Sequence, residues 1–216
     1  MPLLVDSPTE LTTAATDFAL GLFAVAGWFG LYRLPHRNLV RRLWLALLAA
    51  LAASSFLGAA AHAIRMDKAV NDLLWQPLYF LLGLTLTLLA LVAVAGWRGE
   101  PAAAGAVKWL LPLPFLVVAV TWLGSGSFIW FVLFEALIMT FCAGVYLSLV
   151  RRRHPGSGWV LAGIMISILA AVVQAAGPYS FKLIWLFDHN GLFHIVQLPG
   201  VVCFVVGAHK NLTANL

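Results

Sequence analysis

The sequence predicts an all-α membrane protein, a bundle of seven transmembrane helices, on three observations. The 216 residues are 62% hydrophobic and only 10% charged, whereas a soluble domain carries about 25% charged residues. Seven segments are long and apolar enough to cross a bilayer, which takes about 20 residues each. These segments use most of the chain, so we expect a single membrane domain over residues 1–216.

Short connectors separate the predicted spans and are rich in Pro, Gly and charged residues. Backbone groups in hydrocarbon must bond within their own segment, so each span is expected to be a helix. Pro112 and Pro114 are expected to kink the fourth helix, and Pro199 the seventh. The predicted spans are residues 11–34, 40–64, 72–97, 105–123, 127–150, 158–177 and 184–207.

The ends of the spans follow from the sequence between them. Residues 1–10 contain two acids and no Lys or Arg, so we expect a retained first span and not a cleaved signal peptide. RLPHRN separates the first span from the second, and WRGEPAAAG the third from the fourth. GSGS then separates the fourth from the fifth, and RRRHPGSG the fifth from the sixth.

The distribution of positive charge predicts the orientation of the bundle. Ten of the thirteen Lys and Arg residues lie in the loops after the first, third and fifth spans or in the C-terminal tail. Cytoplasmic loops carry such an excess, so we expect the N-terminus outside and the C-terminus in the cytoplasm. The net charge of +5 resides in these short loops and indicates no nucleic-acid partner. We expect a multi-pass protein of a bacterial inner membrane.

Acids and histidines gather at the predicted outer end of the bundle. A charged group inside a bilayer costs roughly 2.5–3.5 kcal/mol, so this asymmetry predicts a functional site at that depth. The group includes Glu10, Asp17, His62, Asp72, Asp188, His189 and His194, and the amide of Asn190 lies among them.

Imidazole and carboxylate at one depth on three helices predict a zinc site. Zinc binds N and O ligands tetrahedrally and leaves one position for a water in catalytic sites. The candidate ligands are His62, Asp72 and His194, with His189 as a fourth. Each histidine needs an acid or amide to orient its ring. The candidates for that role are Glu10, Asp17, Asn190 and Gln197.

This order of residues resembles the membrane hydrolase superfamily of alkaline ceramidases, adiponectin/progestin receptors, hemolysin-III-like proteins and Per1-like proteins. Members have a Ser and a His late in helix 2, an Asp early in helix 3 and a His-x3-His pair early in helix 7. His62 and Asp72 match the first His and the Asp, and Asp188-His-Asn-Gly-Leu-Phe-His194 resembles the last motif. The resemblance implies zinc-dependent hydrolysis of an amide or ester bond in a membrane lipid.

The chain departs from that pattern at two places. Gly58 stands where the family has its Ser, and Ser55 lies two turns before His62 on the same helix face. Ser55 is therefore the candidate for the catalytic hydroxyl, together with Asp72. His189 and His194 are five residues apart, and five residues turn a helix by about 500°, so they do not share a face. His189 reaches the site only if it precedes the helix, with Asn190 as N-cap.

Glu135 and the aromatic residues complete the prediction. Glu135 lies near mid-depth in the fifth span, so we expect it to face the bundle interior, to have a polar partner and to line the substrate cavity. Trp and Tyr residues gather near the outer ends, as in an interfacial belt. They are Trp75, Tyr79, Trp122, Trp130, Tyr179 and Trp185. We expect them to form this belt and not a substrate-binding site.

Other functions stay open from the sequence alone. The polar cluster is also compatible with a non-enzymatic receptor-like or assembly protein in which it only ties helices together. His62 and His194 could instead be axial ligands of a haem. Glu135 at mid-depth is the residue that a transporter would use.

Overall fold

A computed structural model describes residues 3–35, 37–124, 128–177 and 179–214. Within these residues, seven helices are long and apolar enough to cross a membrane, so the predicted all-α seven-helix bundle is confirmed. One of the seven is built from two shorter helices. The helices are α1 Pro8–Tyr32, α2 Leu39–Ala63, α3 Lys68–Arg98, α4 Glu100–Leu110, α5 Leu113–Leu123, α6 Ile129–Arg151, α7 Ser157–Ala175 and α8 His189–Thr213.

Local side-chain chemistry sets several of the helix starts. The first backbone N–H groups of a helix have no partner within it, and a short polar side chain before the helix satisfies one of them. Ser7 accepts from the Glu10 N–H at the start of α1, and Asn38 accepts from the Arg41 N–H at the start of α2. Asp188 accepts from the Gly191 N–H at the start of α8.

The fourth span bends where its prolines lie, as predicted. α4 ends at Leu110 and α5 begins at Leu113, with Pro112 between them and Pro114 in the first turn of α5. A proline lacks the N–H that the preceding turn needs and its ring crowds that turn. α8 continues as one helix through Pro199.

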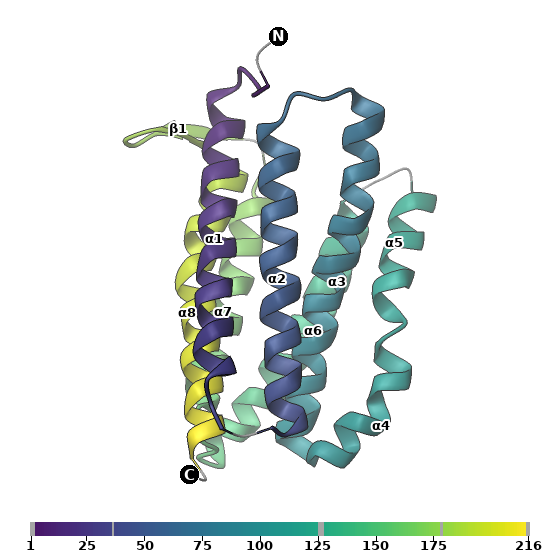
Figure 1. Cartoon of the computed structure of the whole chain (residues 1–216), viewed down its shortest axis with the longest axis vertical. Coiled ribbons are helices and arrows are strands. Elements are labelled where there is room, and N and C mark those ends of the chain that lie inside the picture. Colours follow the sequence, from purple (N-terminus) through teal and green to yellow (C-terminus); the bar gives the residue numbers. More distant parts are fainter. Residues whose placement is uncertain (1–2, 36, 125–127, 178, 215–216) are drawn as a thin grey trace.

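Six of the membrane-length helices form a ring around the interior of the bundle. α1 packs on α2, α2 on α3, α3 on α6, α6 on α7, α7 on α8, and α8 closes the ring on α1. α4 and α5 lie outside this ring against α3 (Figure 1). α1 begins at one end of the bundle and α8 ends at the other, as an odd number of spans requires (Figure 1).

The seventh membrane span, which is α8, begins later than the sequence suggested. The prediction of a span from residue 184 was wrong, because residues 180–188 form a β-hairpin before α8. β1 (Ser180–Lys182) pairs antiparallel with β2 (Leu186–Asp188). A short apolar run does not distinguish a strand from a helix, which explains the error. Leu183, Ile184 and Trp185 at the hairpin turn are each more than 60% exposed.

Glycines let α7 and α8 approach closely. A Cβ added at Gly163 would lie 2.8 Å from the Phe204 ring and 3.0 Å from the Gly200 carbonyl oxygen of α8. Gly156, which precedes α7, has a φ of +76° and lies against the Gly207 backbone. Small residues at such interfaces allow close packing of membrane helices, and here they join the last two helices of the ring.

Candidate functional site

A cavity of about 730 Å³ lies inside the ring of helices. Its walls are mostly apolar, and its polar side chains come from α1, α2, α3, α6, α7 and α8. Of the ten predicted site residues, Glu10 and His189 do not line it. The eight that do are Asp17, Ser55, His62, Asp72, Glu135, Asn190, His194 and Gln197.

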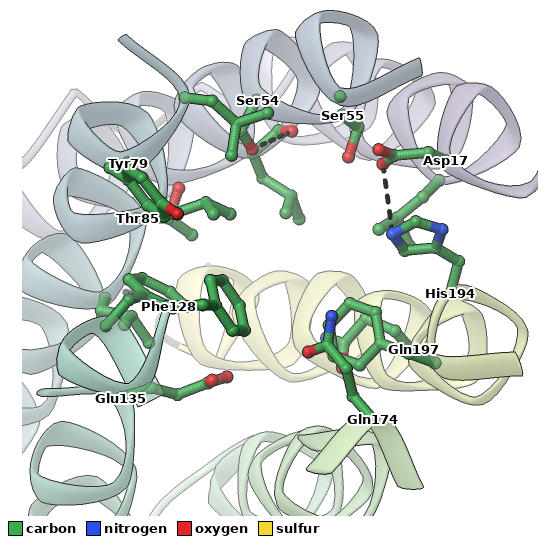
Figure 2. Close-up of a pocket in the computed structure, with 18 of the residues that line it drawn as sticks. Asp17, Ser54, Ser55, Tyr79, Thr85, Phe128, Glu135, Gln174, His194 and Gln197 are labelled. Atoms are coloured by element: carbon green, nitrogen blue, oxygen red, sulfur yellow. Dashed lines mark hydrogen bonds and ion pairs between the residues drawn. The ribbon is translucent and has the colours of Figure 1, made fainter. Parts of the chain in front are cut away.

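Asp17 of α1 and His194 of α8 face each other across one wall of the cavity (Figure 2). Their side chains are only 9% and 10% exposed, and Asp17 Oδ1 lies 3.8 Å from His194 Nε2. This distance exceeds a direct hydrogen bond, which spans about 2.7–3.2 Å. It is short enough for a single water to contact both atoms.

Thr16 fixes which nitrogen of His194 carries a proton. The Thr16 hydroxyl lies 2.9 Å from the Thr13 carbonyl oxygen and 3.1 Å from that of Thr12, so it donates to the helix backbone. It therefore accepts from His194 Nδ1, which lies 3.3 Å away. His194 Nε2 then presents a lone pair toward the Asp17 carboxylate, and the space between two such acceptors suits a hydrogen-bond donor.

Gly58 of α2 provides the space that Asp17 occupies. A Cβ built at Gly58 would overlap Asp17 Oδ2 and would lie 3.3 Å from Asp17 Cγ. Ser55, one turn earlier on α2, presents its hydroxyl to the same carboxylate (Figure 2). The hydrolase superfamily that this sequence resembles has a Ser at the position of Gly58. In this chain the missing side chain leaves a space in α2, and Asp17 of α1 occupies it.

His62 of α2 has a carboxylate partner of its own. Its Nδ1 lies 2.6 Å from Glu10 Oε2 in the first turn of α1. The N-terminal segment holds this turn in place, since the Val5 N–H donates to the Ala63 carbonyl oxygen. A carboxylate on Nδ1 keeps the proton there and leaves Nε2 free to accept one. The Trp75 ring packs edge-on against His62, with centroids 5.8 Å apart.

Asp72 and His189 lie apart from these pairs. Asp72 Oδ2 accepts from Lys68 Nζ at 2.6 Å, and its side chain is 56% exposed at the edge of the cavity. His189 is the first residue of α8, and Asp188 is the N-cap. The condition under which His189 could reach the site, with Asn190 as N-cap, is therefore not met, because the Asp188 carboxylate accepts from the Gly191 N–H. The His189 ring lies 6.2 Å from that of Tyr179.

The amides of α7 and α8 tie these two helices together. Gln174 Nε2 donates to Asn190 Oδ1 at 3.0 Å, and Gln197 Nε2 donates to Ser167 Oγ at 2.9 Å. Among the described residues, Gln197 Oε1 is buried and has no hydrogen-bond partner. Asn190 and Gln197 thus contact α7 side chains, and neither accepts a bond from His194 in the described part of the chain.

The predicted zinc ligands do not converge on one point. Within the part of the chain that the structure describes, no three His, Cys, Asp or Glu side chains are arranged to hold a metal ion. Asp72 is paired with Lys68, and His189 does not line the cavity. The four residues as arranged do not fit a zinc centre.

Three aromatic side chains that the sequence assigned to an interfacial belt also line the cavity. They are Trp75, Tyr79 and Trp122, and Tyr79 is only 5% exposed. Thr16 and Gly58 were not predicted for the site. No sequence signal points to Thr16, whereas the departure at Gly58 marked an unusual position without showing what fills it.

Comparison with curated proteins and with solved structures gives no match. One family model does match, over residues 12–213, and that range includes every cavity residue described above. The model describes the DUF6962 family, a family of unknown function. Because the match covers nearly the whole bundle, the chain belongs to the DUF6962 family.

Proposed function

We propose that this protein is a membrane hydrolase that cleaves an amide or ester bond of a lipid bound in the cavity. The observation that carries the proposal is the Asp17–His194 pair, which is nearly buried and lines a cavity with mostly apolar walls. An apolar cavity suits an acyl chain, and an imidazole beside a carboxylate suits the transfer of a proton from water. The resemblance to the ceramidase and receptor superfamily supports the same class of reaction.

The chemistry follows from the protonation states that the contacts impose. A water held between Asp17 Oδ1 and His194 Nε2 gives up a proton to this pair as its oxygen attacks the lipid carbonyl. The Ser55 hydroxyl, next to Asp17, donates to the oxygen on which negative charge develops (Figure 2). The proton then passes to the departing nitrogen or oxygen, so that the products are a fatty acid and an amine or alcohol.

His62 serves the same site through its free nitrogen. The Glu10 carboxylate holds Nδ1, and the ring lines the same cavity as Asp17 of α1 and Ser55 of α2. A neutral imidazole in this state accepts a proton at Nε2 and returns it in a later step. We assign His62 the relay of protons between the buried pair and the mouth of the cavity.

Two residues support access from the bilayer. Gln76 of α3 and Trp122 of α5 line the cavity and also line a second, apolar groove between α3 and α5. α5 lies outside the ring of helices, so this groove faces the lipid side of α3 (Figure 1). A lipid can therefore approach from within the membrane without crossing water.

Hydrolysis by the purified protein tests the proposal. The protein in detergent micelles is given fluorescently labelled ceramide, an acyl amide, and fluorescently labelled phosphatidylcholine, an acyl ester, and release of the labelled fatty acid is measured. We expect release from one of them, with a loss of about 100-fold or more in Asp17→Asn and His194→Gln. Ser148→Ala, on α6 outside the cavity, is the control. Binding of the lipid without release would favour the receptor-like alternative.

A further inference from the structure

The proposed reaction does not use two acids that line the cavity: Asp72, which pairs with Lys68 at the exposed edge, and Glu135 of α6. The Glu135 carboxylate points into the cavity from the side opposite Asp17 and Ser55 (Figure 2). The sequence predicted that it faces the interior with a polar partner. In the described part of the chain, however, no hydrogen bond or ion pair to its side chain is found.

Aromatic rings surround this end of the cavity. Tyr79 of α3 lies with its ring centroid 6.2 Å from that of Phe128 and 6.4 Å from that of Phe131. The two phenylalanine rings are 5.3 Å apart. All three side chains line the cavity, and Phe131 and Phe128 lie about one and two turns before Glu135 along α6. The negative faces of such rings attract cations.

The described residues that line the cavity bring no Lys or Arg to Glu135. Among the described lining residues, Lys68 is the only Lys or Arg, and it pairs with Asp72 at the exposed edge. A carboxylate in apolar surroundings is costly unless a cation or several donors compensate it. A carboxylate together with aromatic faces is the arrangement that recognises an ammonium group.

We propose that the cavity binds an amphiphile whose ammonium group lies between Glu135 and the rings of Tyr79, Phe128 and Phe131. The alkyl chain of the ligand then runs along the apolar wall, which includes Leu82, Leu86 and Met139. This inference deepens the proposed function, on whose cavity it rests, because it names lipids that carry an ammonium group as the class of substrate. Glu135 acts as a specificity residue, and Asp17 and His194 act on the bond that is cleaved.

Binding of three amphiphiles of equal chain length tests the inference without any turnover. Decyltrimethylammonium, decanol and decanoate are titrated into the full-length protein in dodecyl maltoside micelles, and affinity is measured by tryptophan fluorescence, since Trp75 and Trp122 line the cavity. We expect the ammonium compound to bind at least about tenfold more tightly than the other two. Equal affinity for decyltrimethylammonium and decanol would overturn the inference.

Variants locate the binding. Glu135→Gln keeps the shape and should lose at least about tenfold in affinity for decyltrimethylammonium, and Phe128→Leu should lose several-fold. The matched control is Glu100→Gln, because the Glu100 carboxylate accepts from the Leu39 N–H and does not line the cavity. An unchanged affinity in Glu135→Gln contradicts the proposal. If a variant fails to fold, the comparison of the three compounds on the unmodified protein still tests the proposal.

The outcome is separable from that of the proposed function. Selective ammonium binding in a protein that hydrolyses neither labelled lipid supports this inference and contradicts the hydrolase. Hydrolysis that is equally fast for phosphatidylcholine, which carries an ammonium group, and for ceramide, which does not, with no loss in Glu135→Gln, contradicts this inference alone.

Discussion

Substitution of Gly58 by alanine isolates the contribution of Asp17 with very little change in chemistry. The added methyl carbon would overlap Asp17 Oδ2 and would lie 3.3 Å from Asp17 Cγ and 3.5 Å from Leu78 Cδ1. Carbon and oxygen atoms in contact stay about 3.3–3.6 Å apart, so the carboxylate oxygen must retreat by about 1 Å. A displacement of about 1 Å at a reacting group costs on the order of 100-fold in rate.

The same substitution should not weaken the fold. Alanine in a helix interior is favoured over glycine by roughly 0.5–1 kcal/mol, and this gain offsets the local crowding at Asp17. We therefore expect Gly58→Ala to lose about 100-fold in kcat/KM for the labelled lipid with a Tm close to that of the unmodified protein. The assay pairs lipid hydrolysis with thermal unfolding in the same detergent.

Gly144→Ala is the matched control for this experiment. Gly144 lies in the interior of α6, and a Cβ there meets no atom of the described residues within 4 Å. Its hydrolysis rate should equal that of the unmodified protein. Wild-type activity in Gly58→Ala would refute the reasoning, because it would mean that the position of the Asp17 carboxylate does not matter.

Three further predictions test other parts of the molecule. Asp72→Asn should change the rate of hydrolysis less than twofold, because Asp72 is paired with Lys68 at the exposed edge and such a pair contributes only about 0–1 kcal/mol to stability. A loss as large as that in Asp17→Asn would restore Asp72 to the site. Gly156→Ala should lower the free energy of unfolding by about 1–3 kcal/mol, since Gly156 has a φ of +76° and its Cβ would lie 3.0 Å from the Gly207 carbonyl carbon. An unchanged Tm in thermal unfolding would contradict the α7–α8 packing. A reporter that functions only in the cytoplasm should be active when fused to the C-terminus, and a stable but silent fusion would reverse the predicted orientation.

The fold could be predicted because hydrophobic length is a strong signal in a membrane protein. Five of the spans begin and end within a few residues of the predicted bounds, whereas the fourth begins earlier, at Glu100, and the seventh ends later, at Thr213. The start of the seventh could not be placed, since residues 183–187 are apolar enough for a helix and form part of a hairpin. Residues 184–188 therefore belong to the hairpin and not to the span.

The site was harder to predict, because the sequence gives the depth of a residue but not the direction in which its side chain points. Glu10 and His62 are 52 positions apart, and only the fold brings them to 2.6 Å. Asp72 has the right depth but turns toward Lys68. Asp17 reaches α2 because Gly58 has no side chain, and no motif announces such a gap.

The central claim is that this bundle hydrolyses a lipid with water held at Asp17 and His194. Lipid cleavage in water enriched in heavy oxygen tests it most directly, with mass spectrometry of the fatty acid that is released. We predict that each fatty acid gains one heavy oxygen in the presence of the unmodified protein and that Asp17→Asn and His194→Gln abolish this gain. Absence of heavy oxygen in the product, or equal incorporation by both variants, would contradict the account.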